Sequence, residues 1–271
     1  MKRFCFRVAA LVLIAVVSLL AFGYFRAQTL SNAPNGKSTS VVVVELFTSE
    51  GCSSCPPADA LLAKLGEQSP AGGVEIVALE EHVDYWNDGG WYDPFSSRQW
   101  TDRQDEYAGV LGNKNPYTPQ MVVDGNSEFV GSRGQLALKS IAQAAQRPKV
   151  MVTVTQGNPT KRGSENFSVT VGKLSDVTKA NAVEVWLAIT ETGLHNNVTG
   201  GENSGHELRH AAIVRSMRKI GEAKAAGEPS FSDEAAIPVR SEWKRENLRA
   251  VAFVQEKKSL RIIGAAQIPL R

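Results

Sequence analysis

Hydrophobic residues are grouped in two different ways along the chain. In the first half, residues 41–47 form an apolar, valine-rich run interrupted only by Glu45, which is typical of a strand buried on both faces. Pro56-Pro57 fits the first turn of a helix, and leucines then recur on one face up to Leu65. This order predicts a buried strand followed directly by an amphipathic helix.

Further elements of the same kind follow. A second strand is predicted over residues 74–79, and Asp124-Gly125 is typical of a tight hairpin turn. A last helix is predicted over residues 134–146. A parallel strand pair joined by a helix and completed by a hairpin predicts an α/β domain over residues 41–147.

From residue 148 onward the pattern changes to short alternating segments. The predicted strands are 150–154, 167–171, 183–190, 211–215, 236–240, 248–254 and 262–268. Several short strands separated by turns predict a mainly-β, sandwich-like domain over residues 148–271.

The N-terminus has the pattern of a secretory signal. Basic residues in Met1-Lys2-Arg3 precede an uncharged stretch over residues 8–25. We interpret residues 1–27 as a signal peptide or, at this length, a membrane anchor, and the polar residues 28–40 as a linker. The protein is therefore expected to be exported, either periplasmic or secreted, or held at the membrane by its N-terminal segment.

Two cysteines lie at the predicted junction between strand and helix, in Cys52-Ser53-Ser54-Cys55. Free backbone N–H groups and the dipole of a helix start stabilise a thiolate, so Cys52 is the expected nucleophile and Cys55 the resolving thiol. A structural staple and a metal site stay open as alternatives. The closed loop is too short to stabilise the fold strongly, and no second cysteine pair completes a zinc knuckle.

Together with Thr118-Pro119, the cysteine motif resembles the thioredoxin-like superfamily. That resemblance implies a cis-proline at Pro119 beside the cysteines, and a Thr118 backbone that pairs with substrate. Residues 46–59, 82–86 and 117–120 are more specifically similar to an uncharacterised family of exported bacterial thioredoxin-like proteins, domain of unknown function 1223. The family implies a fold and a compartment but no substrate, and the inserted residues 80–115 depart from thioredoxin itself.

Other side chains near the cysteines are candidates for supporting roles. A buried carboxylate under a cysteine pair can relay protons, which makes Glu45 and Glu50 candidate relay groups, and His82 is a candidate general base in the same relay. Trp86 lies in the aromatic inserted segment and is a candidate wall of the substrate groove. His82 is alternatively a third copper ligand beside Cys52 and Cys55.

The sequence His206-Glu207-Leu208-Arg209-His210 matches the H-E-x-x-H pattern of zinc proteases. That chemistry needs a long helix with both histidines on one face. Gly205 precedes the motif and residues 211–214 suit a strand equally well, so we interpret the match as accidental.

These observations favour an exported thiol–disulfide oxidoreductase that needs no cofactor and acts on protein thiols or disulfides. A membrane electron donor is a further expected partner, and the direction depends on the reduction potential. The near balance of 30 basic and 28 acidic residues gives no reason to expect nucleic acid. Two alternatives stay open: a copper-binding chaperone, and a non-catalytic partner-binding module.

Overall fold

The computed structural model describes residues 40–67, 73–113, 115–159, 163–180, 182–224 and 227–271. Residues 39–271 form one compact unit. The predicted signal or anchor and nearly all of the predicted linker lie outside the described residues. Among the described helices, none is both long enough and apolar enough to cross a membrane.

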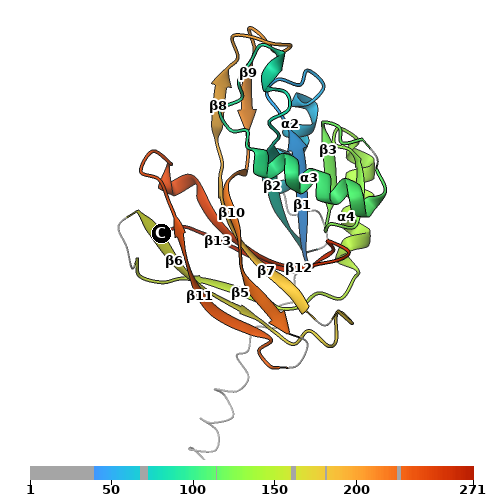
Figure 1. Ribbon diagram of the computed structural model, residues 1–271, viewed down its shortest axis with the longest axis vertical. Coiled ribbons are helices and arrows are strands. Elements are labelled where there is room, and N and C mark those ends of the chain that lie inside the picture. The colour runs from blue at the N-terminus through green and yellow to red at the C-terminus, as the bar shows by residue number, and fades with distance from the viewer. Residues whose placement is uncertain (1–39, 68–72, 114, 160–162, 181, 225–226) are drawn as a thin grey trace, which may run out of the picture. The chain divides into compact units, whose positions relative to one another are not determined.

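An eight-stranded mixed sheet is the centre of this unit (Figure 1). Its strands, in spatial order, are β13 (Ile262–Pro269), β12 (Leu248–Glu256), β7 (Ala182–Glu191), β10 (Ile213–Lys224), β2 (Val74–His82), β1 (Ser40–Thr48), β3 (Gln120–Val123) and β4 (Ser127–Val130). β1 and β2 are parallel, and β10 joins β2 in parallel where Ile213 pairs with Glu80. The other pairs are antiparallel.

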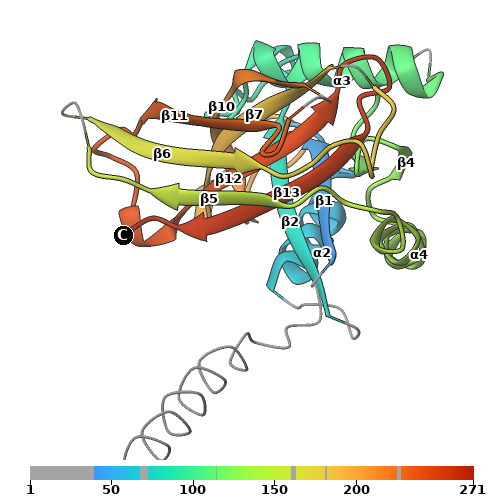
Figure 2. The same ribbon diagram turned by 90° about the horizontal axis from the view of Figure 1, so that it is seen from below.

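Helices and a second sheet cover the two faces of the large sheet. α2 (Pro56–Glu67) and α4 (Gly134–Ala145) pack on one face of β1, β2 and β3, and α3 (Arg98–Leu111) packs on the other. A three-stranded sheet of β11 (Phe231–Pro238), β6 (Ser164–Val171) and β5 (Val152–Gln156) packs on β7, β12 and β13. Figure 2 shows this sheet and α3 on opposite sides of those strands. Two single-turn helices, η1 (Asn87–Gly89) and η2 (Arg245–Asn247), complete the elements outside the hairpin described next.

A short hairpin of β8 (Leu194–Asn197) and β9 (Glu207–His210) lies between β7 and β10 in the chain. It extends past the end of the large sheet, beside α2 (Figure 1). Its connecting loop packs closely on the loop at residues 89–91: a Cβ on Gly200 would lie 2.2 Å from the carbonyl oxygen of Gly90. Only glycine fits at this close approach of two backbones.

The fold class expected from the sequence, an α/β thioredoxin-like domain followed by a sandwich-like domain, is wrong. The protein is mostly β, and β7, β10, β12 and β13 extend the same sheet that contains β1 and β2. The physical reason is that β2 offers an open edge, and β10 joins it where Ile213 pairs with Glu80 and the N–H of Glu80 donates to the carbonyl of Ala212. The division at residues 147 and 148 stays a prediction about separate folding units.

Candidate functional site

Cys52 and Cys55 form a disulfide between the end of β1 and the start of α2, with their Cα atoms 5.4 Å apart. The carbonyl of Cys55 accepts the first hydrogen bonds of α2, from the backbone of Ala58 and Asp59. Both cysteines have 0% exposed surface, although Ser53 and Ser54 between them are exposed. The disulfide thus lies at a helix start, as the sequence indicates, but under a layer of other residues.

The loop between β8 and β9 contacts this junction, and we call residues 198–206 the cover. Asn203 Nδ2 donates to the carbonyl oxygens of Glu50 and Cys52 at 2.8 and 3.0 Å. The backbone N–H and the hydroxyl of Ser53 donate to Glu202 Oε2 at 3.0 and 2.6 Å, and these hydrogen bonds lower the pKa of Glu202. Four hydrogen bonds therefore attach the cover to the residues around Cys52.

Trp86, Thr118 and Pro119 lie on the other side of this junction. Trp86 Nε1 donates to Thr118 Oγ1 at 2.8 Å, and a Cβ on Gly51 would lie 3.1 Å from the Cβ of Trp86. The Thr118–Pro119 peptide bond is cis, as the resemblance implied. Gly131 is in close contact with both Pro119 and Ala58, which places Pro119 next to the first turn of α2.

His82 and His210 meet in a buried group with Glu50, Glu80 and Asp93, which we call the histidine cluster. His82 Nδ1 lies 2.7 Å from Asp93 Oδ2, and its Nε2 lies 3.3 Å from Glu80 Oε1. His210 Nδ1 lies 2.7 Å from the same Glu80 oxygen, and its Nε2 lies 3.0 Å from Glu50 Oε1. Each imidazole is therefore placed between two carboxylates.

The carboxylates decide the protonation of these histidines. Burial lowers the pKa of His82, but Asp93 and Glu80 outweigh burial and raise it well above its usual value. Burial likewise lowers the pKa of His210, yet the charge of Glu80 and hydrogen bonds to Glu50 and Glu80 raise it to about 9. The two imidazoles in turn lower the pKa of Glu80 and Asp93 against the effect of burial.

Asp59 lies one turn after Cys55 on α2 and is buried against the end of β1. Thr48 Oγ1 donates to its Oδ1 at 2.6 Å. Burial, reinforced by the charge of Glu80, raises the pKa of Asp59 to about 7. A carboxyl that titrates near neutral pH beside a cysteine pair is suited to exchange protons with a thiol.

Glu45 lies in a different buried group, the arginine cluster, with Glu81, Arg103, Tyr107 and Gln255. Arg103 Nη2 lies 2.6 Å from Glu45 Oε1, and Tyr107 donates to Glu45 Oε2 at 2.5 Å. Gln255 hydrogen-bonds both Arg103 and Tyr107. Glu45 is thus held in an ion pair on the α3 side of the sheet.

The structure brings together only part of the candidate set proposed from the sequence. Glu50 and His82 share the histidine cluster, and Trp86 contacts Thr118, whereas Glu45 lies apart from all of them. Both nitrogens of His82 face carboxylates rather than the cysteines. These assignments to proton relay and substrate binding stay predictions.

Several residues of the site were missed in the sequence. Asp59 had a detectable signal, since it follows Cys55 by four residues in a predicted helix, but Glu202 and Asn203 had none. His210 was noticed only as part of the H-E-x-x-H match. Because residues 207–210 form strand β9, the helix required by a zinc protease is not formed there.

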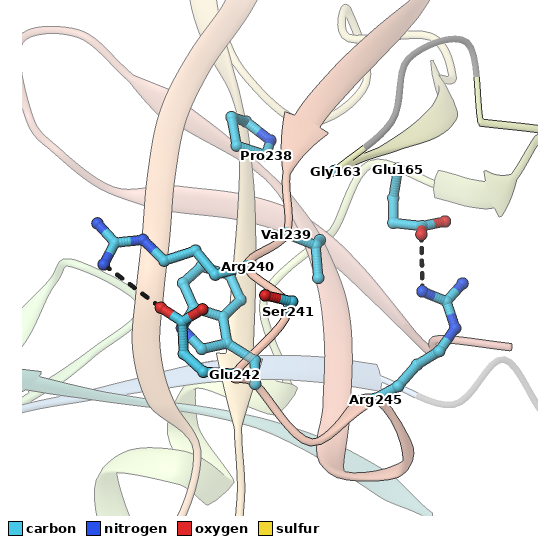
Figure 3. Close-up of a pocket in the computed structure, with 9 residues that line it drawn as sticks. Gly163, Glu165, Pro238, Val239, Arg240, Ser241, Glu242 and Arg245 are labelled. Atoms are coloured by element: carbon cyan, nitrogen blue, oxygen red, sulfur yellow. Dashed lines mark hydrogen bonds and ion pairs between the residues drawn. The ribbon is translucent and has the colours of Figure 1, made fainter.

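A separate surface hollow lies between β6 and the segment that follows β11 (Figure 3). Figure 3 shows Arg240 turned toward Glu242 and Arg245 toward Glu165, at 3.7 and 2.6 Å respectively. Because each arginine already pairs with a carboxylate, neither is a free cation for an anionic ligand in this hollow.

The fold and the site define a mostly β protein with a covered Cys-x-x-Cys disulfide next to a cis-proline. A family model described as "Protein of unknown function (DUF1223)" matches residues 43–255, so the chain belongs to that family. No curated protein has a significantly similar sequence.

Solved structures support the same architecture across both halves of the chain. Protein AGR_C_4864 from Agrobacterium tumefaciens is 25% identical, with a TM-score of 0.61, over 84% of this chain and 93% of that one. HBP35 of Porphyromonas gingivalis is 16% identical, with a TM-score of 0.64, over 86% of this chain and 76% of that one, and shows a shared fold.

Proposed function

We propose that this protein is an exported thiol–disulfide oxidoreductase that exchanges the Cys52–Cys55 disulfide with protein thiols. The observation that carries the proposal is the disulfide at the start of α2, next to the cis peptide bond of Thr118–Pro119 and the indole of Trp86. A helix start favours a cysteine thiolate as leaving group and as nucleophile. The basic and apolar N-terminal segment supports export, where such a pair meets protein disulfides.

The exchange takes place in two balanced steps. A substrate thiolate attacks Cys52 Sγ, the Cys52–Cys55 bond breaks, and Cys55 leaves as a thiolate that takes up a proton. A second substrate thiolate then attacks the substrate sulfur of the mixed disulfide and releases Cys52. The substrate dithiol loses two electrons and becomes a disulfide, while the cysteine pair becomes a dithiol; the reverse sequence reduces a substrate disulfide.

The cover has to move for either direction, because neither cysteine is exposed. Its four hydrogen bonds join Glu50, Cys52 and Ser53, and none of these four goes to Cys55. Displacement of Glu202 and Asn203 therefore uncovers Cys52 first, which supports Cys52 as the attacked sulfur. A partner protein, such as a membrane electron donor or an exported client, would displace the cover by binding Ser53 and the Thr118–Pro119 edge.

The burial of both cysteines also favours a second candidate, a non-catalytic module in which the disulfide only rigidifies the loop before α2. The equilibrium reduction potential separates the two functions. We expect a value between about −270 and −120 mV, the range of exchanging cysteine pairs, whereas structural disulfides lie below about −300 mV. A value below that limit would overturn the oxidoreductase proposal.

The rate of reduction tests the cover. Asn203→Ala removes two hydrogen bonds of roughly 1 kcal/mol each, so reduction by dithiothreitol should be up to about thirtyfold faster. Asn166→Ala, on the three-stranded sheet, is the matched control and should leave the rate unchanged. Equal rates in the two variants would show that the cover does not limit access. Trapping of a partner by Cys55→Ala and not by Cys52→Ala would identify the attacked cysteine.

A further inference from the structure

Two histidine nitrogens point at one carboxylate oxygen inside the histidine cluster. His82 Nε2 and His210 Nδ1 lie 3.3 and 2.7 Å from Glu80 Oε1. These three atoms, all buried, lie within 4.8 Å of one another. The residues come from two elements far apart in the chain: Glu80 and His82 end β2, and His210 ends β9.

The three ligand atoms lie close to the spacing of zinc ligands. Zinc binds imidazole nitrogen and carboxylate oxygen at about 2.0–2.1 Å, so adjacent ligands of a tetrahedral ion lie about 3.3 Å apart. The pair formed by His82 and Glu80 already has this separation at 3.3 Å. An outward movement of His210 from 2.7 Å would give its pair with Glu80 the same separation, and the two histidine nitrogens already lie within 4.8 Å of each other.

In each histidine the ring nitrogen that faces away from Glu80, which we call the outer nitrogen, has a carboxylate partner, as is usual for metal-binding histidines. His82 Nδ1 faces Asp93 Oδ2, and His210 Nε2 faces Glu50 Oε1. A carboxylate at this position fixes the ring and the tautomer, leaving the inner nitrogen with a lone pair for a metal. Both rings are oriented in this way toward the same point.

The carboxylates of the cluster are themselves held in place. Glu50 accepts hydrogen bonds from Trp91 Nε1 and Asn196 Nδ2, both at 2.9 Å. The second oxygen of Glu80 accepts from the backbone N–H of Ala211 at 2.8 Å, which leaves Oε1 for the histidines. Glu80 is thus arranged as a ligand with one oxygen.

The two rings lie close enough to share one ion. Their centroids are 4.8 Å apart, and the ring nitrogen that faces Glu80 in each is not the one that faces Asp93 or Glu50. In a neutral imidazole the nitrogen without a proton has a lone pair, so these two nitrogens can bind one divalent ion together with Glu80.

We propose that Glu80, His82 and His210 form a buried site for a divalent transition-metal ion of the zinc class. Oxygen and imidazole ligands suit Zn²⁺, and three protein ligands leave the fourth tetrahedral position to a non-protein ligand. Since His210 belongs to the hairpin that carries the cover, the ion joins this hairpin to β2 and holds the cover over the disulfide.

The metal content of the full chain tests this site. The protein is purified with a tag that does not bind metal, its disulfide kept oxidised, and its metals are measured by mass spectrometry. The chelator-treated protein is then titrated with Zn²⁺ against a competing dye. We expect one zinc ion per chain, and Co²⁺ in its place should show the visible absorption of a four-coordinate ion.

Variants assign the ligands. Asp93→Asn changes only the carboxylate behind His82 and should weaken zinc binding by roughly 10- to 100-fold. His210→Gln and His82→Gln each remove a ligand and should weaken zinc binding by more than that. His195→Gln is the matched control, because His195 is exposed on β8 in the same hairpin. If a histidine variant does not fold, Glu80→Gln and the Co²⁺ spectrum of the unaltered chain provide the same information.

Two results would overturn the site. One is a chain that binds no Zn²⁺ in the titration, which would leave the cluster with protons alone. The other is a zinc affinity that falls in a Cys52→Ser/Cys55→Ser double variant but not in the His210 and Glu80 variants, which would place the ion on the cysteines. Retention of zinc in the double cysteine variant supports the site independently of any redox activity.

Discussion

The arginine cluster and the histidine cluster lie on opposite faces of β2, and they balance buried charge in different ways. Glu80 and Glu81 are consecutive in this strand, so their side chains point to opposite faces and enter different clusters. On the α3 face Arg103 provides a permanent cation for Glu45. On the α2 face, among the described residues, the ion pairs of Glu80 and its neighbours are made only with His82 and His210.

This difference separates a structural ion pair from a candidate site. A guanidinium is always protonated and has no lone pair, so the arginine cluster can hold only the charges it already has. An imidazole can exchange its proton for a metal ion, so the composition of the histidine cluster depends on solution conditions. Burial of charge is common to both clusters, and the type of cation decides which one can bind a ligand.

Removal of the guanidinium should have the largest effect on stability. In Arg103→Met the carboxylate of Glu45 is left buried without its cation, which typically costs about 3–5 kcal/mol. Urea unfolding measures this loss in the free energy of unfolding. Arg98→Met removes an exposed ion pair with Asp102 on the same helix and should cost about 0.5 kcal/mol or less. Similar losses in both variants would show that burial of the Glu45 pair has no special role.

Zinc should stabilise the protein through the histidine cluster alone. At a free Zn²⁺ concentration of about 100 times the dissociation constant, the free energy of unfolding should rise by about 2.7 kcal/mol. Arg98→Met, whose change lies outside both clusters, should show the same increase, and His210→Gln should show none. An equal increase in His210→Gln would place the stabilising ion elsewhere and remove the contrast between the two clusters.

The central strands β1 and β2, which carry residues of both clusters, were predictable from the sequence, but β9 and the pairing of distant strands were not. Residues 41–47 are apolar except for Glu45, the pattern of a strand buried on both faces such as β1, so the pattern alone identified the strand. β8 and β9 contain mainly polar residues and had no such signal. The pairing of Ile213 with Glu80 joins two strands that are far apart in the chain. Hydrophobic periodicity within each strand does not specify which strand lies beside it.

The candidate site shows the same division. The cysteine pair and its place before a helix were evident from four consecutive residues and their flanks. Glu202 and Asn203 are separated from their partners by about 150 positions, as the 149 between Ser53 and Glu202 illustrates. His210 was visible only in a motif whose helix does not form, since residues 207–210 are a strand. Long-range contacts, rather than residue types, were the missing information.

Within the arginine cluster, removal of the Glu81 carboxyl should raise the free energy of unfolding, a smaller effect than that of Arg103→Met and opposite in sign. Its oxygens make no hydrogen bond among the described residues, and its ion pair with Arg103 is long, at 3.6 Å. Glu81→Met removes a buried carboxyl without breaking the pair of Arg103 with Glu45, and we expect a gain of about 1 kcal/mol in the free energy of unfolding. Glu45→Met is the matched control, because it removes the carboxylate that does pair with Arg103, and it should destabilise the protein. A loss of stability in Glu81→Met would show that Glu81 is part of the pair.

Glu256 extends the comparison to a carboxylate that is only partly buried and gives the smallest effect. Burial raises its pKa, but hydrogen bonds from Arg261, Ser259 and Thr178 outweigh burial and lower it from 4.5 to about 2. A lowered pKa stabilises the folded state above pH 4.5, and this contribution is lost as the pH falls through 2. The stability difference between the protein and Glu256→Gln should therefore stay below about 1 kcal/mol and shrink across that range. Glu242→Gln, in an exposed pair, is the control and should show a flatter pH dependence. A Glu256 effect as large as that of Arg103→Met would mean that the number of hydrogen bonds, and not burial, sets the scale of these charge contributions.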